Sequence, residues 1–454
     1  MPAKNEASGI SRRRLLKTGA AGGMTFFAEG CSPDSNANFR AEAGSLPEKS
    51  GTRNGYRTYM DAYHFNECLE CGACLAGCPF MELSEGGAAA AIVSLRRENE
   101  DEYRDVLDRC VACFKCNHRC PVQAVPAALM LQRLRDRRSS EEVVPKPIRY
   151  ALNGMADRGW RPNLFKDFYT DLDADEKRAL DAWSEPKNCG SGDMLFCGCG
   201  TRIFPYDIEH SKVLADLPKF GGAEDCCGLF ACRGGLFDQS CFIIERLVAR
   251  LSQSRFRRLV VACGSCQEMF QVALPHYLGQ KFPFRVISLY EYIEERMRAG
   301  KAAIQRQVPA EESDACLSDS CHGYEFGGEY LARIERLYRA AGFSCVELEH
   351  NRDNNACCGL IGYFNRGTVA GIIKTSTVKR DDIKKSGMKN VLTYCQGCYI
   401  SSRILGPGRA HYLLEKLLWA LGDDIRYPQS AIISRALNFN SIKNMLLLGP
   451  GALI

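Results

Sequence analysis

The chain has 454 residues, which is several times the length of a common domain of about 100–150 residues and enough for two to four packed units. Hydrophobic residues make up 46% and charged residues 25%, an ordinary globular balance that excludes a disordered or fibrous protein. The net charge of +5 is too weak over this length to indicate a nucleic-acid-binding protein, and no apolar run is long enough to span a membrane. The unusual feature is the 25 cysteines.

The N-terminal segment has a recognisable charge pattern. Residues 11–17 have the sequence Ser-Arg-Arg-Arg-Leu-Leu-Lys, which resembles the twin-arginine export signal, and a short, mildly apolar stretch follows. We predict a targeting segment over residues 1–31 and a polar linker over residues 32–60. The alternative is a basic, unstructured N-terminus, because the apolar stretch is short and contains Glu29.

Residues 61–140 contain two copies of one cysteine motif. The pattern C-x2-C-x2-C-x3-C-P runs from Cys68 to Pro79 and again from Cys110 to Pro121. This spacing is the bacterial ferredoxin pattern for a 4Fe-4S cubane, whereas a zinc site needs only two close pairs. Disulfide scaffolds are short chains without a core, so they do not explain this chain. We predict a ferredoxin domain with two cubane clusters over residues 61–140.

The two motifs are expected to exchange their last cysteines, because in two-cluster ferredoxins the fourth cysteine of each run binds the other cluster. The two predicted ligand sets are Cys68, Cys71, Cys74 and Cys120 for one cubane, and Cys110, Cys113, Cys116 and Cys78 for the other. The segment 88–109 between the motifs is predicted to be a helix. With this helical insertion, the unit resembles the helical ferredoxin domains of the succinate dehydrogenase type.

A connecting segment is expected over residues 141–188, and an internal repeat follows it. The first copy is placed at 189–310 and the second at 311–430. Each copy has a single cysteine, a Cys-Cys-Gly and a C-x-x-C; the two sets are Cys199, Cys226, Cys227, Cys263 and Cys266, and Cys321, Cys357, Cys358, Cys395 and Cys398. Gly228 and Gly359 are expected to let the backbone turn tightly beside the cysteine pairs.

Short β-like runs at 259–262 and 391–394 lead into the C-x-x-C motifs, and helical patterns follow at 289–297 and 413–421. Strands that alternate with helices predict small α/β units with a mostly parallel sheet. The sequence thus predicts a multidomain protein of mixed α+β and α/β class, with a helical two-cluster ferredoxin domain followed by two repeated, small α/β cysteine-rich domains. The tail, 431–454, is too short to span a bilayer and is expected either to dock on a partner subunit or to pack on its own domain.

The repeated cysteine pattern resembles the duplicated cysteine-rich (CCG) domain of heterodisulfide reductase, which recurs in iron–sulfur subunits of glycolate oxidase and anaerobic glycerol-3-phosphate dehydrogenase. Fused behind two ferredoxin motifs, the layout is similar to the D subunit of heterodisulfide reductase. The first copy departs from the pattern, since 26 residues separate Cys199 from Cys226 while 35 separate Cys321 from Cys357. Either this loop is shortened or Cys197 is the leading ligand.

The resemblance implies that each five-cysteine set holds a noncubane 4Fe-4S cluster, in addition to the two cubanes. In heterodisulfide reductases the two noncubane clusters face each other and split a disulfide between them, so these ten cysteines are predicted to be catalytic. The alternative is that one set is vestigial or binds an ordinary cubane. His322 directly follows Cys321 and is a candidate proton donor to a departing thiolate, with a purely structural histidine as the alternative.

The function that this resemblance implies is an oxidoreductase that passes electrons from a membrane cytochrome b, or another redox subunit, through the cubanes to the CCG clusters. There a disulfide-type substrate would be reduced, or its dithiol oxidised. The alternative is a non-catalytic relay between a flavoprotein dehydrogenase, of the glycolate, lactate or glycerol-3-phosphate type, and quinone. We expect membrane association through a partner, on the periplasmic face if the twin-arginine signal is used and in the cytoplasm otherwise. No nucleic-acid partner is expected.

Overall fold

A computed structural model describes residues 59–138, 144–152 and 169–426, except 223, 278, 280, 281, 283 and 363–368. The described residues all belong to one compact unit, Ala41–Ile454. The predicted twin-arginine segment and the predicted C-terminal tail lie outside the described residues, as does the predicted linker except for its last two residues.

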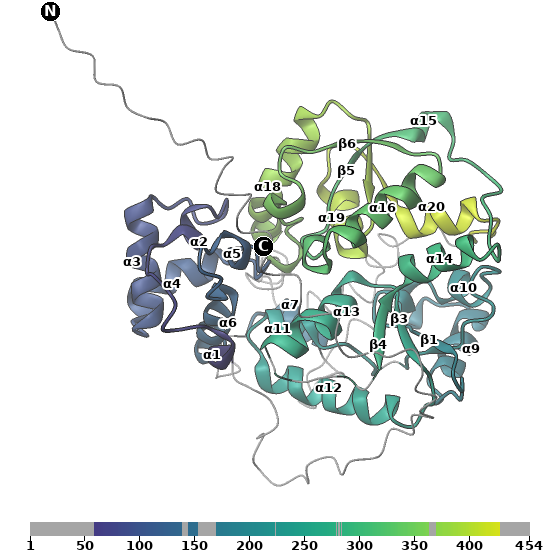
Figure 1. Ribbon diagram of the computed structural model, residues 1–454, viewed down its shortest axis with the longest axis horizontal. Coiled ribbons are helices and arrows are strands. Elements are labelled where there is room, and N and C mark those ends of the chain that lie inside the picture. Colours follow the sequence, from purple (N-terminus) through teal and green to yellow (C-terminus); the bar gives the residue numbers. More distant parts are fainter. Residues whose placement is uncertain are drawn as a thin grey trace, which may run out of the picture. The chain divides into compact units, whose positions relative to one another are not determined.

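The ferredoxin region is helical (Figure 1). Its elements are α1 (Tyr59–Ala62), α2 (Ala73–Ala76), α3 (Glu85–Arg96), α4 (Glu100–Arg109), α5 (Cys116–Arg119) and α6 (Pro126–Arg137). The short helices α2 and α5 lie inside the two cysteine motifs, and α3 and α4 fill the insertion between them. Buried side chains of α3, α4 and α6, among them Leu95, Leu107 and Leu131, share one hydrophobic core.

The prediction that residues 88–109 are helical is confirmed for most of this segment, but two helices occupy it, with a break at residues 97–99. The helix α3 begins one turn earlier, where the Ser84 hydroxyl accepts a hydrogen bond from the Gly87 N–H at 3.2 Å and caps the N-terminus. It ends at Arg96, and Glu98 then takes a left-handed conformation with φ of 61°, which an α-helix does not allow. A new helix starts at Glu100 with three acidic residues in its first turn, a favourable charge at a helix N-terminus.

The two cysteine-rich copies each contain a four-stranded, entirely parallel sheet with the same strand order. The first sheet has the order β2-β1-β3-β4, with β1 (Asp193–Phe196), β2 (Lys219–Phe220), β3 (Arg258–Val261) and β4 (Arg285–Ser288). The second has the order β6-β5-β7-β8, with β5 (Asp314–Leu317), β6 (Ser344–Glu347), β7 (Asn390–Thr393) and β8 (Arg409–Tyr412). The internal repeat is therefore a repeat of structure, and the prediction of parallel sheets is confirmed.

Helices pack around these sheets at matching places in the two copies. Those of the first copy are α10 (Pro205–Glu209), α11 (Leu229–Arg233), α12 (Phe237–Leu251), α13 (Gly264–Glu268), the π-helix η3 (Met269–Tyr277) and α14 (Leu289–Arg298), with the 3-10 helix η2 (Thr201–Ile203) before α10. Those of the second are α15 (Ala310–Ser313), α16 (Gly328–Ala340), α18 (Val369–Lys385), α19 (Gln396–Leu405) and α20 (Leu413–Ala420), with the 3-10 helices η4 (Gly323–Phe326) and η5 (Arg352–Asn354). Two helices, α7 (Lys146–Leu152) and α9 (Ala174–Trp183), lie in the segment that connects the ferredoxin region to the repeat.

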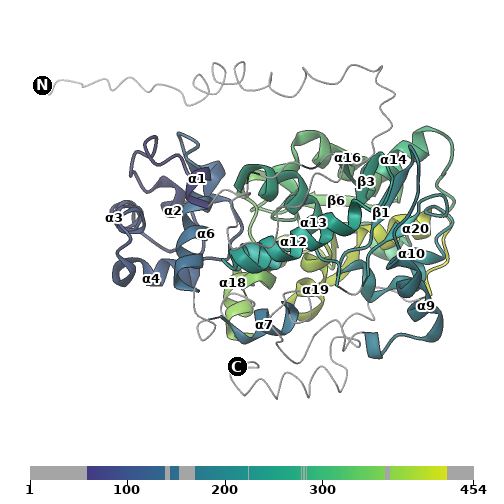
Figure 2. The ribbon, with the colours of Figure 1, turned by 90° about the horizontal axis from the view of Figure 1, so that it is seen from below.

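The two copies contact each other through α14 and α16, which lie side by side in Figure 1 and Figure 2. The carboxylate of Glu294 accepts hydrogen bonds from Arg333 Nε at 2.9 Å and from Arg336 Nε at 2.7 Å. Beneath these ion pairs, apolar side chains from both copies, such as Ile293 and Ile334, belong to one buried cluster. The shared core holds the two sheets together as one body, which fixes the relative position of their cysteines.

Candidate iron–sulfur sites

The ferredoxin cysteines group across the two motifs. The pKa of Cys74 is raised to about 12, chiefly by burial and then by its neighbours Cys120, Cys68 and Cys71. The pKa of Cys116 is raised by burial and then by nearby thiols of both groups, those of Cys74, Cys113, Cys110 and Cys78. Each group thus contains the last cysteine of the other motif, which agrees with the exchanged ligand sets predicted for two cubanes.

The surroundings of these cysteines fit a cluster. A cavity in the ferredoxin region is lined by Cys74, Cys78, Cys110, Cys113 and Cys116, and the rest of its wall is almost wholly apolar. Backbone N–H groups point at the sulfurs: Ala112 N donates to Cys110 Sγ at 3.3 Å, and Ala124 N donates to Cys120 Sγ at 3.2 Å. Thiolate donors, apolar walls and N–H···S bonds are the environment that 4Fe-4S clusters take in proteins. The residues therefore fit the two implied cubanes.

The five cysteines of each repeat form a chain of contacting thiols. In the first copy the contacts run in the order Cys199, Cys226, Cys227, Cys266 and Cys263. In the second copy they run in the matching order Cys321, Cys357, Cys358, Cys398 and Cys395. In each copy, all five predicted cysteines are therefore gathered into one largely buried site. This site has the donor set that an additional iron–sulfur cluster requires.

The fold explains why these cysteines meet. In both copies the leading cysteine follows the first strand of the sheet and the C-x-x-C follows the third, so both lie at the carboxyl edge of a parallel sheet. The Cys-Cys-Gly brings the remaining pair to this edge, and its glycine has a left-handed φ of 77° at Gly228 and 88° at Gly359. At these angles each glycine N–H donates to the first cysteine of its pair at 3.4 Å, so the expected tight turns are present.

The geometry favours Cys199 over Cys197 as the leading cysteine of the first copy. The Cys199 thiol is hydrogen-bonded to Cys226, whereas Cys197 is fully buried and its sulfur lies 3.9 Å from the Leu195 carbonyl oxygen. The shorter spacing in this copy therefore reflects a shorter loop rather than a change of ligand.

The two five-cysteine sites face each other across a pseudo-symmetric contact. Gly200, which follows the leading cysteine of the first copy, lies against Gln396, which follows the third-strand cysteine of the second copy. Conversely, Gly264 of the first copy lies against His322 of the second. A Cβ atom built on Gly264 would be 3.6 Å from the His322 ring carbon Cδ2. The Gln396 Nε2 atom donates to the Gly200 carbonyl oxygen at 3.0 Å. At this contact the second copy contributes the side chains of Gln396 and His322, and the first copy contributes only glycine backbone.

The second ferredoxin motif contacts the second copy. Phe80, Val111 and Cys357 form a small buried cluster, and Cys78 and Cys113 pack against it. Beside this cluster, His118 Nε2 lies 2.6 Å from Glu325 Oε1, and the buried Lys115 Nζ donates to the Arg352 carbonyl oxygen at 3.2 Å. The cysteine set that includes Cys113 is therefore adjacent to the second five-cysteine site.

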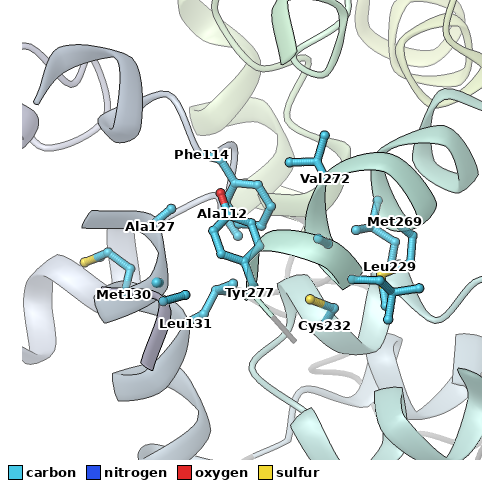
Figure 3. Close-up of a cluster of buried hydrophobic side chains, with 14 of the residues drawn as sticks. Ala112, Phe114, Ala127, Met130, Leu131, Leu229, Cys232, Met269, Val272 and Tyr277 are labelled. Carbon is cyan, nitrogen blue, oxygen red and sulfur yellow. The ribbon is translucent and has the colours of Figure 1, made fainter. Parts of the chain in front are cut away.

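The same motif also contacts the first copy. The ring centroids of Phe114 and Tyr277 are 5.3 Å apart. Figure 3 shows the two rings against each other. Asn117 Nδ2 donates to the Tyr277 hydroxyl at 2.7 Å, and Asn117 Oδ1 accepts from the Ala127 N–H at 2.9 Å. One short ferredoxin loop is thus held against both repeats.

A buried charged group between the repeats was not predicted from the sequence. Arg233 and Glu268 of the first copy are 1% and 0% exposed, and Arg233 Nε donates to Glu268 Oε1 at 3.1 Å. His322 of the second copy is hydrogen-bonded to Glu268 through Nδ1 and to the Cys395 thiol. Burial, and then the positive charge of Arg233, lower the pKa of His322. The only sequence signal is the position of these charges within a few residues of cysteines.

Comparison with known proteins agrees with this architecture. A family described as "4Fe-4S dicluster domain" matches residues 64–124, and a family described as "Cysteine-rich domain" (CCG) matches residues 210–271 and 316–401. The chain is therefore an iron–sulfur protein with a dicluster ferredoxin domain followed by duplicated cysteine-rich domains.

Its relatives make the identification more specific. The D subunit of dihydromethanophenazine:CoB--CoM heterodisulfide reductase of Methanosarcina acetivorans is 21% identical over 389 residues, which cover 78% of this chain and 91% of the relative. The B subunit of fumarate reductase (CoM/CoB) of Methanothermobacter marburgensis is 22% identical, covering 81% of this chain and 74% of the relative. The domain content and these similarities together indicate an iron–sulfur electron-transfer subunit that is related to the heterodisulfide reductase D subunit and the fumarate reductase B subunit.

A third relative bears on location. A probable membrane-anchored ferredoxin of Chromohalobacter salexigens is 22% identical, covering 75% of this chain and 56% of the relative. In the described part of this chain, we find no helix with the length and apolar character that a bilayer crossing demands.

Proposed function

We propose that the chain is the disulfide-reducing subunit of a multi-subunit oxidoreductase, in which the two five-cysteine sites act together on one disulfide-type substrate. The observation that carries this proposal is that the two sites have the same internal order of thiol contacts and face each other. Clusters bound at these thiols would supply one-electron transfer. Two such centres suit the reaction R–S–S–R′ + 2 e⁻ + 2 H⁺ → R–SH + R′–SH, which takes up two electrons as the S–S bond breaks.

The chain's own residues define the geometry of this reaction. The cysteines at the carboxyl edges of the two sheets hold the reacting centres, and the contact between α14 and α16 fixes the distance between them. Gly200 and Gly264 lack side chains where the two sites meet, so Gln396 and His322 of the second copy lie directly against the backbone of the first copy. His322 is hydrogen-bonded to Cys395 and is the candidate donor of a proton to a departing thiolate.

Electrons are proposed to reach the chain through the first cubane, from a membrane cytochrome b or another redox subunit. Cys71 is the one exposed cysteine among the residues that the structure describes. Within the six residues that precede it in the sequence are two exposed apolar side chains, Leu69 at 64% and Phe65 at 42%. A redox partner that covers this face would approach the Cys68–Cys71–Cys74–Cys120 set. This set is next to the Cys113 set, which in turn is next to the second repeat.

We also propose that this partner anchors the chain at the membrane, on the periplasmic face if residues 1–31 act as an export signal.

Disulfide reduction driven by a reduced viologen under anaerobic conditions tests the proposal. Replacing Cys357 and Cys358 by serine should lower disulfide-dependent viologen oxidation at least tenfold, while the ferredoxin region is still reduced. Cys316→Ser is the matched control, because Cys316 is buried in β5 and its sulfur lies 3.6 Å from the Asn390 carbonyl oxygen, outside the five-cysteine site. Unchanged turnover in the Cys357→Ser/Cys358→Ser protein would overturn the proposal.

A non-catalytic relay for a flavoprotein dehydrogenase is the second candidate. The similarity to the fumarate reductase (CoM/CoB) B subunit favours it, because that relative is named for a reductase of another substrate. Under this alternative the chain would co-purify with a flavoprotein and would transfer electrons to quinone without turning over disulfides. Purification from the native host, with assays for bound flavin and for disulfide turnover, separates the two functions.

A further inference from the structure

Arg233 comes from the first repeat but acts on the second. Its Nη1 atom lies 3.7 Å from Cys321 Sγ, and its charge also acts on Cys357 and on Cys113 of the ferredoxin region. The guanidinium carbon lies 4.7 Å from the centre of the Phe114 ring. Arg233 is therefore buried at the junction of the second ferredoxin motif and the second five-cysteine site.

This cation is held in one orientation. Its Nη2 atom lies 2.5 Å from each carboxylate oxygen of Glu268 and 3.0 Å from His322 Nδ1. A guanidinium cannot lose its proton in a protein, so a fixed positive charge lies beside Cys321. Replacing a buried ion pair by apolar residues is often neutral or stabilising, so stability alone does not explain why both charges are present here.

In the second repeat, the residues at the same distances after the corresponding cysteines are not charged. Arg233 is six residues after Cys227, and the residue six positions after Cys358 is Phe364. Glu268 is two residues after Cys266, and the residue two positions after Cys398 is Ile400. The repeat therefore carries charge at these positions in one copy and apolar residues in the other.

Among the residues that the structure describes, the two five-cysteine sites also differ in the buried cations around them. The buried Arg202 acts on Cys226 of the first site. The second site has two buried cations, Arg233 and also Lys379, whose Nζ donates to the Asp319 carbonyl oxygen at 2.5 Å and whose charge acts on Cys398 and Cys358. Reduction adds negative charge to a cluster, so nearby cations and hydrogen bonds to its sulfurs raise its reduction potential.

We propose that the fixed positive charge of Arg233 raises the reduction potential of the second five-cysteine site, so that this site is the more easily reduced of the two. This deepens the proposed function, because the site that adjoins the Cys113 set would then be the one that takes the first electron. The step is a one-electron reduction in which no bond forms or breaks, and the external reductant is the redox partner. The Glu268 carboxylate orients the Arg233 guanidinium and partly offsets its positive charge.

A redox titration of the anaerobic protein, followed by electron paramagnetic resonance, tests the proposal without any turnover. Arg233→Met combined with Glu268→Met removes the ion pair without leaving a buried lone charge, and the midpoint of the second site should shift to a more negative potential while that of the first site stays. Glu268→Gln leaves the cation uncompensated, and the same midpoint should shift the opposite way. Arg233→Lys, which keeps the charge, should restore most of the wild-type value.

Midpoint potentials that shift in opposite directions in Arg233→Met/Glu268→Met and in Glu268→Gln would show an effect of charge. A purely structural role would shift both midpoints in one direction or would cause loss of iron from the site. Iron content reports on folding, with Cys316→Ser as the reference variant. Equal midpoints at the two sites of the wild-type protein, or shifts of one sign in both variants, would overturn the proposal. Failure of the proposed disulfide reaction would not affect these midpoints, so the two hypotheses fail separately.

Discussion

Gln396 of the second repeat donates a hydrogen bond from Nε2 to the Gly200 carbonyl oxygen of the first repeat at 3.0 Å. Each partner directly follows a cysteine of its own five-cysteine site, so the bond connects the two sites through one side chain. The relationship depends on glycine, because a Cβ on residue 200 would collide with the Gln396 side-chain oxygen.

Gly200→Ala is therefore expected to displace Gln396 and to lower the free energy of unfolding by about 1–2 kcal/mol, as expected for a lost buried hydrogen bond. Anaerobic denaturation measures this loss. Shortening the partner as well, in Gly200→Ala/Gln396→Ala, should not destabilise the protein further, because the clash is then gone. Gly264→Ala is the control, since the nearest atom to its Cβ would be His322 Cδ2 at 3.6 Å, an ordinary contact. Equal destabilisation in both single variants would argue against this contact.

Cys199→Ser is expected to remove the iron of the first five-cysteine site, about four atoms per chain if the site holds a 4Fe-4S cluster. Cys197→Ser, only two residues away, should keep this iron, because the Cys197 thiol is buried apart from the site and burial raises its pKa, which disfavours the thiolate that binds metal. Iron analysis of anaerobically purified variants measures the difference. Loss of iron in the Cys197 variant alone would reverse the assignment.

The exchange between the ferredoxin motifs predicts which variants share a phenotype. Cys120→Ser should alter the same reduced-cubane signal as Cys71→Ser, and Cys78→Ser the same signal as Cys110→Ser, because each pair belongs to one group of thiols. Electron paramagnetic resonance of the reduced protein distinguishes the two cubanes. If Cys120→Ser and Cys110→Ser changed one signal together, the motifs would not exchange ligands.

The buried side chain of His411 predicts how the stability of the protein depends on pH. Burial, with Glu312 opposing it, lowers the pKa of His411 to about 4, and its Nε2 lies 3.1 Å from Asn390 Oδ1. Between this value and the ordinary pKa of about 6.5, the unfolded chain binds a proton that the folded chain does not, so stability is lost as pH falls. At pH 5.5 the loss is about 1 kcal/mol relative to pH 7.5. Denaturation at both pH values should show a smaller loss in His411→Gln, and an equal loss would contradict the assignment.

The cysteine sites and the parallel sheets follow from short-range patterns in the sequence. Spacing places Cys263 and Cys266 after a predicted strand, and the repeat places Cys395 and Cys398 in the same way. The break between α3 and α4 was missed because Glu98 is an ordinary helix former that here has a left-handed backbone. The choice between two nearby cysteines at the end of β1 also needed the structure, since both follow the same strand.

The charged group between the repeats could not be predicted from spacing. Arg233 and Glu268 are 35 residues apart in the first copy, so their contact depends on the fold of that copy. His322 lies in the other copy, so its contact with Glu268 depends on how the two repeats pack. In the sequence, each of the three residues lies within two residues of a cysteine, but this position does not indicate that the three meet. Only packing of the copies places the guanidinium beside Cys321.

The central claim is that the two facing five-cysteine sites bind the sulfurs of one substrate. Electron paramagnetic resonance of the oxidised, anaerobic protein with candidate thiols tests it most directly. We expect a paramagnetic signal that appears only when thiol is added and that is absent in Cys357→Ser/Cys358→Ser. An oxidised protein that gives no thiol-dependent signal, and shows only cubane signals after reduction, would contradict the account.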